Sequence, residues 1–356
     1  MSCFNNMLDK SLGNRFLPIK TIEMTKKIQE TKILVTGGAG YIGSVVTEEL
    51  IASGKKVVVV DDLRQGHRDA VVKGADLVIG DIRDEMVLED IFKSAKIDAV
   101  VHLAADSVIG LSMTDPKGCM ENNVIGGMAL LKQMLKHKVT NFVFSSSAAV
   151  YGEPRSIPID ESHPTAPINT YGESKLMLER MLVWYGMAYG LKHISLRYFN
   201  AAGASERFGE DHRPESHLVP NVLSAAIGKM TSVAVFGNDY ATKDGSCVRD
   251  YIHVVDIAQA HILALKKLKT LSGKAYNLGS GSGYSVLQVV KAARKITGAD
   301  IPVQFHPRRT GDPAVLVASC DLAKKELGWV PMYTKIEDII ESAWRWRCDY
   351  PDGYRK

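Results

Sequence analysis

Tyr171 and Lys175 form the one Tyr-x-x-x-Lys pattern in the sequence, and these residue types at this spacing suit acid–base chemistry. They fall at the start of a predicted helix, where residues four apart lie on the same face. An ammonium beside a phenol favours the phenolate and lowers the tyrosine pKa from about 10. We therefore expect Tyr171 to act as a base toward a sugar or alcohol hydroxyl, with a surface Tyr–Lys pair as the alternative.

Three consecutive serines, ending at Ser147, stand at the end of the predicted strand that precedes this helix. In a parallel sheet covered by helices on both faces, ligands bind at the carboxyl ends of the strands. Because the helix of Tyr171 follows that strand, the sequence predicts that the serines and the Tyr–Lys pair meet at this edge of the sheet.

A glycine-rich segment over residues 37–43 (GGAGYIG) lies between a predicted strand and a predicted helix. It contains G-x-G-x-x-G from Gly38 and G-x-x-G-x-x-G from Gly37, and such spacing allows a pyrophosphate to approach the amides of the helix start. Asp61 ends the next strand, where its carboxylate suits ribose hydroxyls and repels a 2′-phosphate. The sequence therefore predicts bound NAD rather than NADP, and a glycine-rich turn without a ligand is the alternative.

The elements that must position these residues are typical of a doubly wound α/β fold. Short β-branched runs alternate with longer helical stretches, and strands that are apolar on both faces require helices on both sides. The crossover rule then gives a parallel sheet of the Rossmann type. We assign residues 31–200 to this NAD-binding domain and residues 201–356 mainly to a smaller C-terminal substrate-binding lobe, with some chain returning to the first domain. The expected strands cover residues 32–36, 56–61, 76–80, 98–103, 141–145 and 193–198, and the expected helices cover 41–53, 85–96, 115–137 and 170–189.

Composition excludes several classes of protein. The 356 residues are 46% hydrophobic and carry a net charge of only +4, which argues against disorder and against a nucleic-acid partner. No apolar run is long enough to cross a membrane. The five cysteines are scattered without a C-x-x-C pair, so we expect a reducing, cytoplasmic compartment. Residues 1–30 lack an apolar signal sequence and are expected to form a flexible N-terminal arm.

Three further features carry weaker expectations. Residues 81–82 (Asp-Ile) follow the third strand and suit either contact with adenine or the capping of the next helix. Arg249 and Arg309 suit a diphosphate, with ordinary surface ion pairs as the alternative. The spacing of His212 and His217 fits neither i+3 nor i+4 and no cysteine is near, so we expect loop residues and no metal there.

Together these motifs resemble the extended short-chain dehydrogenase/reductase family, and within it the nucleotide-sugar 4-epimerases. The resemblance runs from about Ile33 to the C-terminus. It implies an NAD-dependent enzyme that inverts C4 of a UDP-hexose, such as UDP-glucose or UDP-galactose, through a transient 4-keto sugar while NAD stays bound. It also implies a homodimer formed through helices near residues 115–137 and 170–189. The most specific matching segments are TGGAGYIGS, NFVFSSSAAVYGE, NTYGESK, LRYFNAAGA, FGNDYATKDGSCVRDYIHVVD and RRTGDPA.

The resemblance also implies a role for individual residues. Tyr171 is expected to remove the 4-hydroxyl proton, Ser147 to hydrogen-bond the 4-oxygen, and Lys175 to hold the nicotinamide ribose. The expected NAD contacts are Gly37, Gly40, Tyr41, Ile42, Gly43, Asp61, Asp81, Ile82, Asn122, Lys175 and Phe199. The expected UDP-sugar contacts are Ser147, Tyr171, Asn200, His217, Leu218, Phe236, Arg249, Arg309 and Asp312.

Three positions depart from the family pattern, and substrate breadth stays open as a result. Ser107 stands where many bacterial epimerases have lysine, and Thr170 replaces a common proline. Leu316 occupies the position that tunes acceptance of N-acetylated sugars, so N-acetylhexosamine and pentose substrates are alternatives.

Two other kinds of protein share the fold. Sugar-nucleotide dehydratases usually place Asp-Glu, and UDP-glucuronate decarboxylases a Glu, where this chain has Ala148 and Ala149, which argues against both. A binding protein without turnover would have no use for a Ser–Tyr–Lys set. Epimerisation is therefore the favoured prediction.

Overall fold

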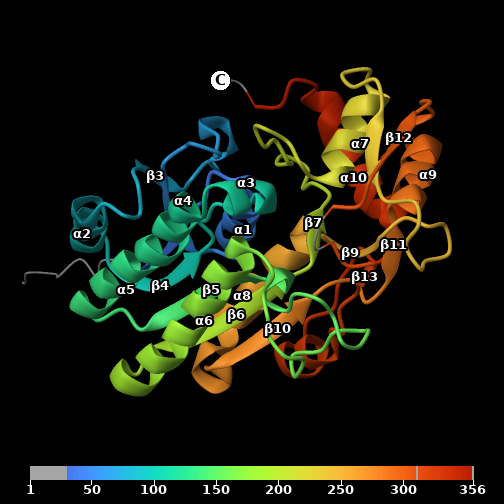
Figure 1. Cartoon of the computed structure of the whole chain (residues 1–356). Helices are drawn as coiled ribbons and strands as arrows, with labels where there is room; N and C mark the ends of the chain where they lie inside the picture. The colour runs from blue at the N-terminus through green and yellow to red at the C-terminus, as the bar shows by residue number, and fades with distance from the viewer. Residues whose placement is uncertain (1–29, 310–311, 355–356) are drawn as a thin grey trace, which may run out of the picture. The chain divides into compact units, whose positions relative to one another are not determined.

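A seven-stranded parallel sheet forms the centre of the described part of the chain, residues 30–309 and 312–354 of a computed structural model (Figure 1). The strand order is β10-β6-β5-β4-β1-β2-β3, which confirms the predicted doubly wound α/β fold. The predicted N-terminal arm falls almost entirely on residues outside those described. The strands are β1 Lys32–Thr36, β2 Lys56–Asp61, β3 Asp76–Ile79, β4 Ile97–His102, β5 Asn141–Ser147, β6 Lys192–Tyr198 and β10 Lys274–Leu278.

Both faces of this sheet are buried under helices. Because side chains alternate across each strand, neighbouring residues pack into different cores. In β1, Ile33 and Val35 pack into one apolar core, while Leu34 between them packs into another. The first core includes helices α1 (Tyr41–Ala52) and α8 (Val254–Leu271). The second includes α2 (Glu85–Ser94), α5 (Gly126–Lys136) and α6 (Thr170–Tyr189) on the opposite face.

The strand order reverses beside β1, and this reversal creates the opening where a ligand can sit. β1 pairs with β2 on one side and with β4 on the other. The loops that follow β1 and β4 come into contact there. Gly37 has φ +71°, and a Cβ on it would lie 2.7 Å from the Ala104 nitrogen. A glycine is therefore required where these two loops meet.

The predicted helix over residues 115–137 is interrupted. It consists of α4 (Pro116–Met120), a π-helical turn (Glu121–Ile125) and α5, and the Asp115 side chain caps its start. The wider turn carries Asn122, one of the predicted NAD contacts, and π turns within helices often lie at functional sites. A short helix before it, α3 (Ile109–Thr114), was not expected from the sequence.

A second group of elements, coloured yellow to red in Figure 1, lies beside the carboxyl edge of the sheet. Its own apolar core joins α7, α9 and α10, and β9 pairs with β7, β11 and β13 while β8 pairs with β12. Because β10 is a strand of the large sheet and α8 packs against one face of it, the chain returns to the first group after entering the second. The division at residue 200 stays a prediction, since residues 31–356 form one compact unit. The elements are β7 Asn200–Ala202, α7 Leu218–Ala226, β8 Val233–Phe236, β9 Val248–His253, β11 Gly283–Ser285, α9 Val286–Thr297, β12 Val303–His306, β13 Val315–Leu316 and α10 Ile336–Asp349.

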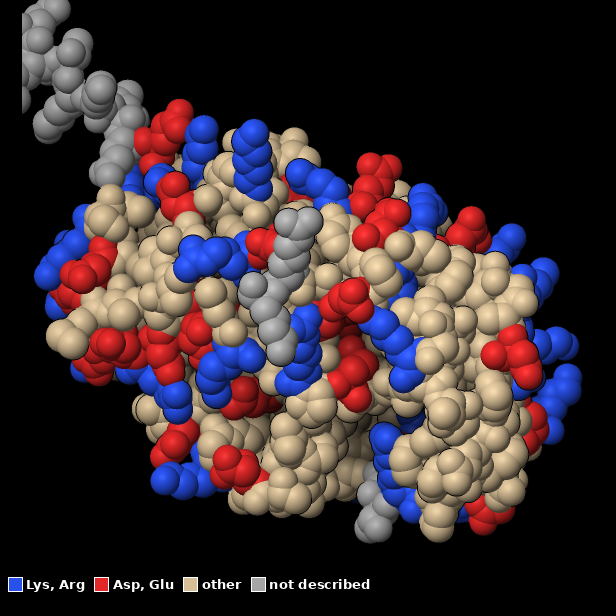
Figure 2. Space-filling view, turned by 90° about the horizontal axis from the view of Figure 1, so that it is seen from above, with Lys and Arg blue, Asp and Glu red and all other residues tan. Residues whose placement is uncertain are grey.

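The surface carries charges of both signs. Figure 2 shows acidic and basic side chains interspersed over the face seen from above. Among the described residues, no helix combines the length and the apolar character needed to cross a bilayer.

Candidate active site

A cavity of about 1350 Å³ opens at the carboxyl edge of the large sheet and extends to the second group of elements. Its volume exceeds the range of roughly 300–1,000 Å³ that is usual for small-ligand sites, so it has room for two large ligands side by side. The cavity brings together every residue that the sequence predicted for the site except Asp81. Those lining residues are Gly37, Gly40, Tyr41, Ile42, Gly43, Asp61, Ile82, Asn122, Ser147, Tyr171, Lys175, Phe199, Asn200, His217, Leu218, Phe236, Arg249, Arg309 and Asp312.

The glycine-rich segment forms a bare cradle at one end of this cavity. A Cβ on Gly43 would lie 2.0 Å from the Gly37 carbonyl oxygen, so the turn closes too tightly for any side chain there. Gly40 precedes α1 without a side-chain cap, which leaves the first amides of the helix to face the cavity. Gly37, Gly40 and Gly43 line the cavity, whereas Gly38 packs against Val59. The spacing that begins at Gly37 is therefore the relevant one.

Asp61 stands beside this cradle at the end of β2. It is only 7% exposed, and its two carboxylate oxygens accept hydrogen bonds of 2.9 Å from the Ala39 and Leu63 amides. Burial raises the pKa of Asp61, and the two amide bonds oppose that rise. Each oxygen keeps further acceptor capacity toward the cavity, so the residue can accept ribose hydroxyls as predicted.

Asp81 is placed differently from the other predicted residues. Its carboxylate pairs with Arg83, whose Nε lies 2.9 Å from Oδ2, and this hydrogen bond lowers the pKa of Asp81. Asp81 does not cap the next helix either, because the cap is Asp84, whose side chain accepts the Met86 amide at the start of α2. Only its neighbour Ile82 lines the cavity.

The predicted catalytic residues come together where β5 ends and α6 begins. Asn169 caps α6 by accepting the Gly172 amide at 2.8 Å, and a Cβ on Gly172 would lie 2.4 Å from the Ala149 carbonyl oxygen. This close contact places Tyr171 near Ser147, which lowers the pKa of the phenol against the rise caused by burial. The Ser147 oxygen already accepts the Ala149 amide at 3.1 Å, so its proton is available to a ligand.

Lys175 lies one turn further along α6 and near Tyr171, as the helical spacing predicted. Its Nζ donates to the Ser145 carbonyl oxygen at 2.8 Å and lies 5.7 Å from the centre of the Tyr171 ring. Burial lowers the pKa of Lys175 to about 7, so its charge is itself disfavoured. Burial also raises the pKa of Tyr171 to about 12, and the hydrogen bond to Ser147 only partly opposes this. Lys175 alone therefore does not ionise the phenol.

The low pKa of Lys175 predicts a pH-dependent stability that Lys175→Met removes. The pKa is about 7 in the folded protein against an ordinary 10.5, so between these values the unfolded chain binds one more proton and stability rises with pH. In protein stripped of dinucleotide, the free energy of unfolding of the parent relative to Lys175→Met should rise by about 2 kcal/mol from pH 7 to pH 9. Urea unfolding at the two pH values measures this, and a constant difference would refute the lowered pKa.

The other end of the cavity carries the predicted substrate residues. Arg249 is 9% exposed and pairs with Asp312, so it is not an ordinary surface ion pair. The guanidinium of Arg309 lies 3.9 Å from the centre of the Phe236 ring. Leu316 pairs with Arg249 between β13 and β9 and also lines the cavity, as does Ser107. Two guanidinium groups and an aromatic ring thus converge opposite the glycine cradle.

Several lining residues gave no usable signal in the sequence. Arg64 donates from Nη2 to the Asn122 side chain at 2.8 Å, and Cys119 lies near Tyr171 and Lys175. Neither belongs to a recognisable spacing. Glu210 and Glu215 were also missed. They bracket His212 in a loop, where helical spacing rules do not apply.

The fold and this site define the class of protein. The sequence profile of the NAD dependent epimerase/dehydratase family matches residues 33–279, and the chain belongs to that family.

Individual proteins that are similar to this chain carry more specific names than the family. The chain is 52% identical to a UDP-glucose 4-epimerase of Halalkalibacterium halodurans, over 90% of this chain and 97% of that protein. A crystal structure of a UDP-glucose 4-epimerase superposes with a TM-score of 0.90 at 50% identity, covering 92% of this chain and all of the other. The enzyme from Bifidobacterium longum in complex with NAD+ and UDP superposes with a TM-score of 0.87 at 40% identity, covering 91% of this chain and all of that chain.

Proposed function

We propose that this protein is an NAD-dependent epimerase that inverts C4 of a UDP-hexose and interconverts UDP-glucose and UDP-galactose. One observation carries the proposal. The side chains of Ser147, Tyr171 and Lys175 line the same cavity as the glycine cradle and the two arginines, Arg249 and Arg309. Relatives about 50% identical over nine tenths of the chain carry the name of this activity.

The residues of the cradle fit NAD. A side chain would fill the space at Gly43, the amides at the start of α1 can meet a pyrophosphate, and Asp61 offers acceptors to ribose hydroxyls. When bound, NAD supplies a hydride acceptor that returns the same hydride, together with a positive charge at its oxidised ring. Lys175 is the proposed contact to the nicotinamide ribose, and Asn122 is a further proposed contact to NAD.

Ser147 and Tyr171 are the groups proposed to bind the sugar 4-hydroxyl and to transfer its proton. Ser147 donates its free hydroxyl proton to the 4-oxygen of the sugar, and Tyr171 removes the proton from that oxygen as C4 is oxidised. Because burial raises the pKa of Tyr171 to about 12, the phenolate requires positive charge beyond that of Lys175. After the 4-keto sugar has turned over in the cavity, Tyr171 would return the proton to the 4-oxygen as C4 is reduced again.

Uridine and diphosphate are the proposed anchors of the substrate. Arg249 and Arg309 can each hold phosphate oxygens, and the Phe236 ring beside Arg309 offers an apolar surface to a base. Anchoring through the nucleotide leaves the sugar free to rotate, which inversion at C4 requires. Dehydration is disfavoured, because Ala148 and Ala149 offer no carboxylate beside Ser147.

A panel of UDP-sugars tests the proposal. Purified protein incubated with UDP-glucose, UDP-galactose, their N-acetylated counterparts and UDP-pentoses should convert UDP-glucose and UDP-galactose into one another without added NAD. Chromatography of the products reads the outcome, and the N-acetylated pair shows how Leu316 sets substrate breadth. Formation of a dehydrated product in place of the epimer would overturn the assignment.

We also propose a homodimer formed through α6 and the neighbouring helical run. Large apolar side chains are exposed on these helices, and Trp184 and Met187 on α6 are 68% and 75% exposed. An apolar surface that is exposed in one chain is stabilised by pairing with the same surface of a second copy. The other exposed apolar side chains on these elements are Ile125, Met128, Met177, Val183 and Tyr189.

Met187→Glu should convert the dimer into a monomer, because a charge at the centre of an apolar interface is left without a partner. Met86→Glu on α2 is the matched control, since Met86 is also 75% exposed but lies outside this surface. Light scattering after size-exclusion chromatography measures both masses. A parent protein that is already monomeric, or equal masses for the two variants, would contradict the proposed interface.

A cytoplasmic location is proposed on the state of the cysteines. Cys119, Cys247, Cys320 and Cys348 are free thiols in the described residues, as a reducing compartment maintains them. Cell fractionation against a cytoplasmic marker tests this.

A further inference from the structure

Four side chains outside the proposed catalytic group, Glu210, His212, Glu215 and His217, gather in the loop before α7, and we call them the His/Glu cluster. Each offers one donor atom, and the four atoms all lie within 4.8 Å of one another. Both histidines direct Nδ1 toward the same carboxylate oxygen, Glu210 Oε1, at 3.1 Å from His212 and 2.8 Å from His217. Glu215 approaches from the other side, with Oε1 3.0 Å from His217 Nδ1 and Oε2 3.8 Å from His212 Nδ1.

These separations match the edges of a tetrahedral zinc site. Zinc binds imidazole nitrogen and carboxylate oxygen at about 2.0–2.2 Å, which puts neighbouring donor atoms about 3.3 Å apart in a tetrahedron. The four nitrogen–oxygen separations run from 2.8 to 3.8 Å, with Glu215 approaching His217 through Oε1 and His212 through Oε2, so a four-coordinate ion would take one of these two oxygens after a small shift of the side chains. Two imidazoles and two carboxylates also form a donor set that favours Zn²⁺ over Mg²⁺ or Ca²⁺, which bind through oxygen.

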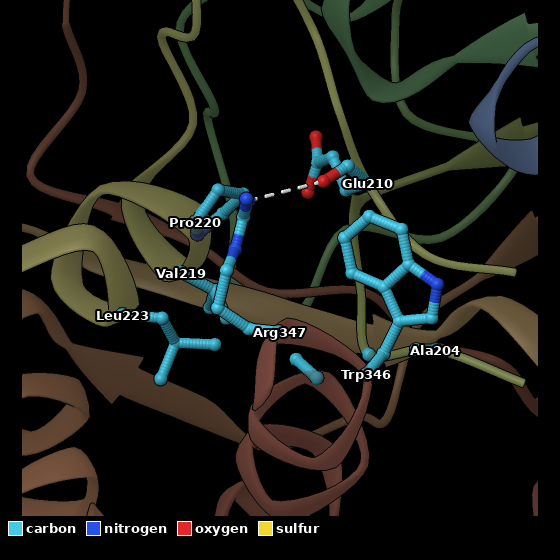
Figure 3. Close-up of a pocket in the computed structure, with 9 residues that line it drawn as sticks. Ala204, Glu210, Val219, Pro220, Leu223, Trp346 and Arg347 are labelled. Carbon is cyan, nitrogen blue, oxygen red and sulfur yellow. Dashed lines mark hydrogen bonds between the residues drawn. The ribbon is translucent and has the colours of Figure 1, made fainter. Parts of the chain in front are cut away.

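The ligands are held in place by groups around them, as metal ligands are. Figure 3 shows Arg347 reaching from α10 toward Glu210, and its Nη2 donates to the Glu210 backbone carbonyl oxygen at 3.3 Å. Glu210 itself is buried, with 8% of its surface exposed. Glu215 Oε1 accepts the backbone amides of Ser216 and His217 at 2.8 Å each, which fixes that carboxylate ahead of α7. The Glu215 carboxylate is thus oriented before any cation binds, whereas Arg347 holds the backbone of Glu210.

We propose that the His/Glu cluster is a binding site for one divalent transition-metal ion, Zn²⁺ in preference to the others. All four of its residues lie on the wall of the large cavity. A bound ion would tie the loop over residues 210–217 to the start of α7 and so hold the part of the wall from which His217 and Leu218 reach the proposed substrate site. Coordination through Nδ1 leaves the other ring nitrogen of His217 outside the metal shell.

The competing explanation is an ion-pair network without metal. Each histidine would then donate an Nδ1 proton to Glu210 Oε1, and one carboxylate oxygen would accept both. Burial opposes the charged form of His217, but attraction to Glu210 raises the pKa of His217 to about 10, which favours such a network. The two explanations differ in a measurable property, because only a metal site binds one equivalent of cation tightly.

The test measures metal binding by the full chain with its bound dinucleotide. A chelator first removes any bound metal. The protein is then titrated with Zn²⁺ in competition with a chromophoric chelator, whose absorbance reports the free metal. The parent protein should bind one equivalent. His212→Gln and Glu215→Gln should each weaken binding by at least about 100-fold, since each removes a ligand. His137→Gln is the matched control, because His137 lies at the end of α5 away from the cavity. Glu215→Gln retains an oxygen acceptor for the two amides and so preserves the loop, which circular dichroism and thermal melting verify.

Replacement of Zn²⁺ by Co²⁺ identifies the donor set. The cluster should give the visible absorption of four-coordinate cobalt without the sulfur-to-metal charge-transfer band that exposed Cys348 would produce. Zn²⁺ should also raise the melting temperature of the parent but not of Glu215→Gln. Failure of the parent to bind a stoichiometric ion, or binding by the two ligand variants as tight as that of the parent, would leave an ion-pair network only. Neither result depends on whether the protein turns over a UDP-sugar, so the proposed function is tested separately.

Discussion

Tyr171→Phe is expected to lower kcat by about 10²- to 10⁴-fold, because it removes the one hydroxyl that can take the proton from the sugar 4-oxygen. The ring is partly buried in the cavity wall, and phenylalanine keeps its shape and its packing at the start of α6. The amount of NAD that copurifies should stay unchanged, since the glycine cradle is untouched. Initial rates of UDP-galactose conversion and the dinucleotide content of the purified protein measure the two effects.

Tyr185→Phe is the matched control for that experiment. Tyr185 lies on the same helix and contacts the Tyr189 ring edge-on, but it does not line the cavity. Loss of its hydroxyl should leave kcat within twofold of the parent. If Tyr171→Phe turned over as fast as Tyr185→Phe, the base would have to be another group, and the proposed proton transfer would be wrong.

Gly43→Ala is expected to abolish retention of NAD and to destabilise the fold. The new Cβ would lie 2.0 Å from the Gly37 carbonyl oxygen, so the backbone of the cradle must shift. Overpacking of this kind costs about 1–3 kcal/mol of stability, and a displaced cradle should weaken NAD binding by at least about 100-fold, or roughly 3 kcal/mol. Thermal melting and the dinucleotide content of the purified variant measure these effects.

Gly40→Ala separates the ligand from the fold. Its Cβ would meet only the Gly37 carbonyl oxygen at 3.4 Å, and the backbone has φ −83°, so the protein alone tolerates the methyl group. We therefore expect the melting temperature to change little while NAD binding falls about tenfold, because the methyl group stands where the pyrophosphate approaches. Full NAD retention in both variants would place the dinucleotide elsewhere.

Much of the fold could be predicted from local pattern. β1 and β2 are apolar on both faces, which is a property of buried parallel strands. The bounds of both strands agree with the prediction residue for residue. α6 also begins and ends where predicted, because Asn169 caps its start and Gly190 ends it in a left-handed conformation. The π turn within residues 121–125 was not predictable, since it arises from packing and leaves no mark on spacing.

The residues of the candidate site could be predicted where they belong to short motifs that meet at one edge of the sheet. The orientation and burial of individual side chains could not be predicted, because contacts with residues distant in the sequence determine them. Asp81 turns to Arg83 rather than toward the cavity, and Lys175 is buried so deeply that its own charge is disfavoured. Helical spacing argued against His212 and His217 as metal ligands, and Glu210 and Glu215 were missed, because all four lie along a loop that folds back to bring Glu210 and His217 within 2.8 Å.

The central claim is that a hydride leaves C4 of the sugar and returns to the same carbon without exchange with water. UDP-galactose that carries deuterium at C4 tests this directly, with the UDP-glucose product analysed by mass spectrometry and proton NMR. The account predicts that deuterium is retained at C4 of the product, because the bound dinucleotide holds it throughout the reaction. Loss of deuterium to solvent would show that the bond is broken as a proton transfer, and it would contradict the proposed chemistry of the site.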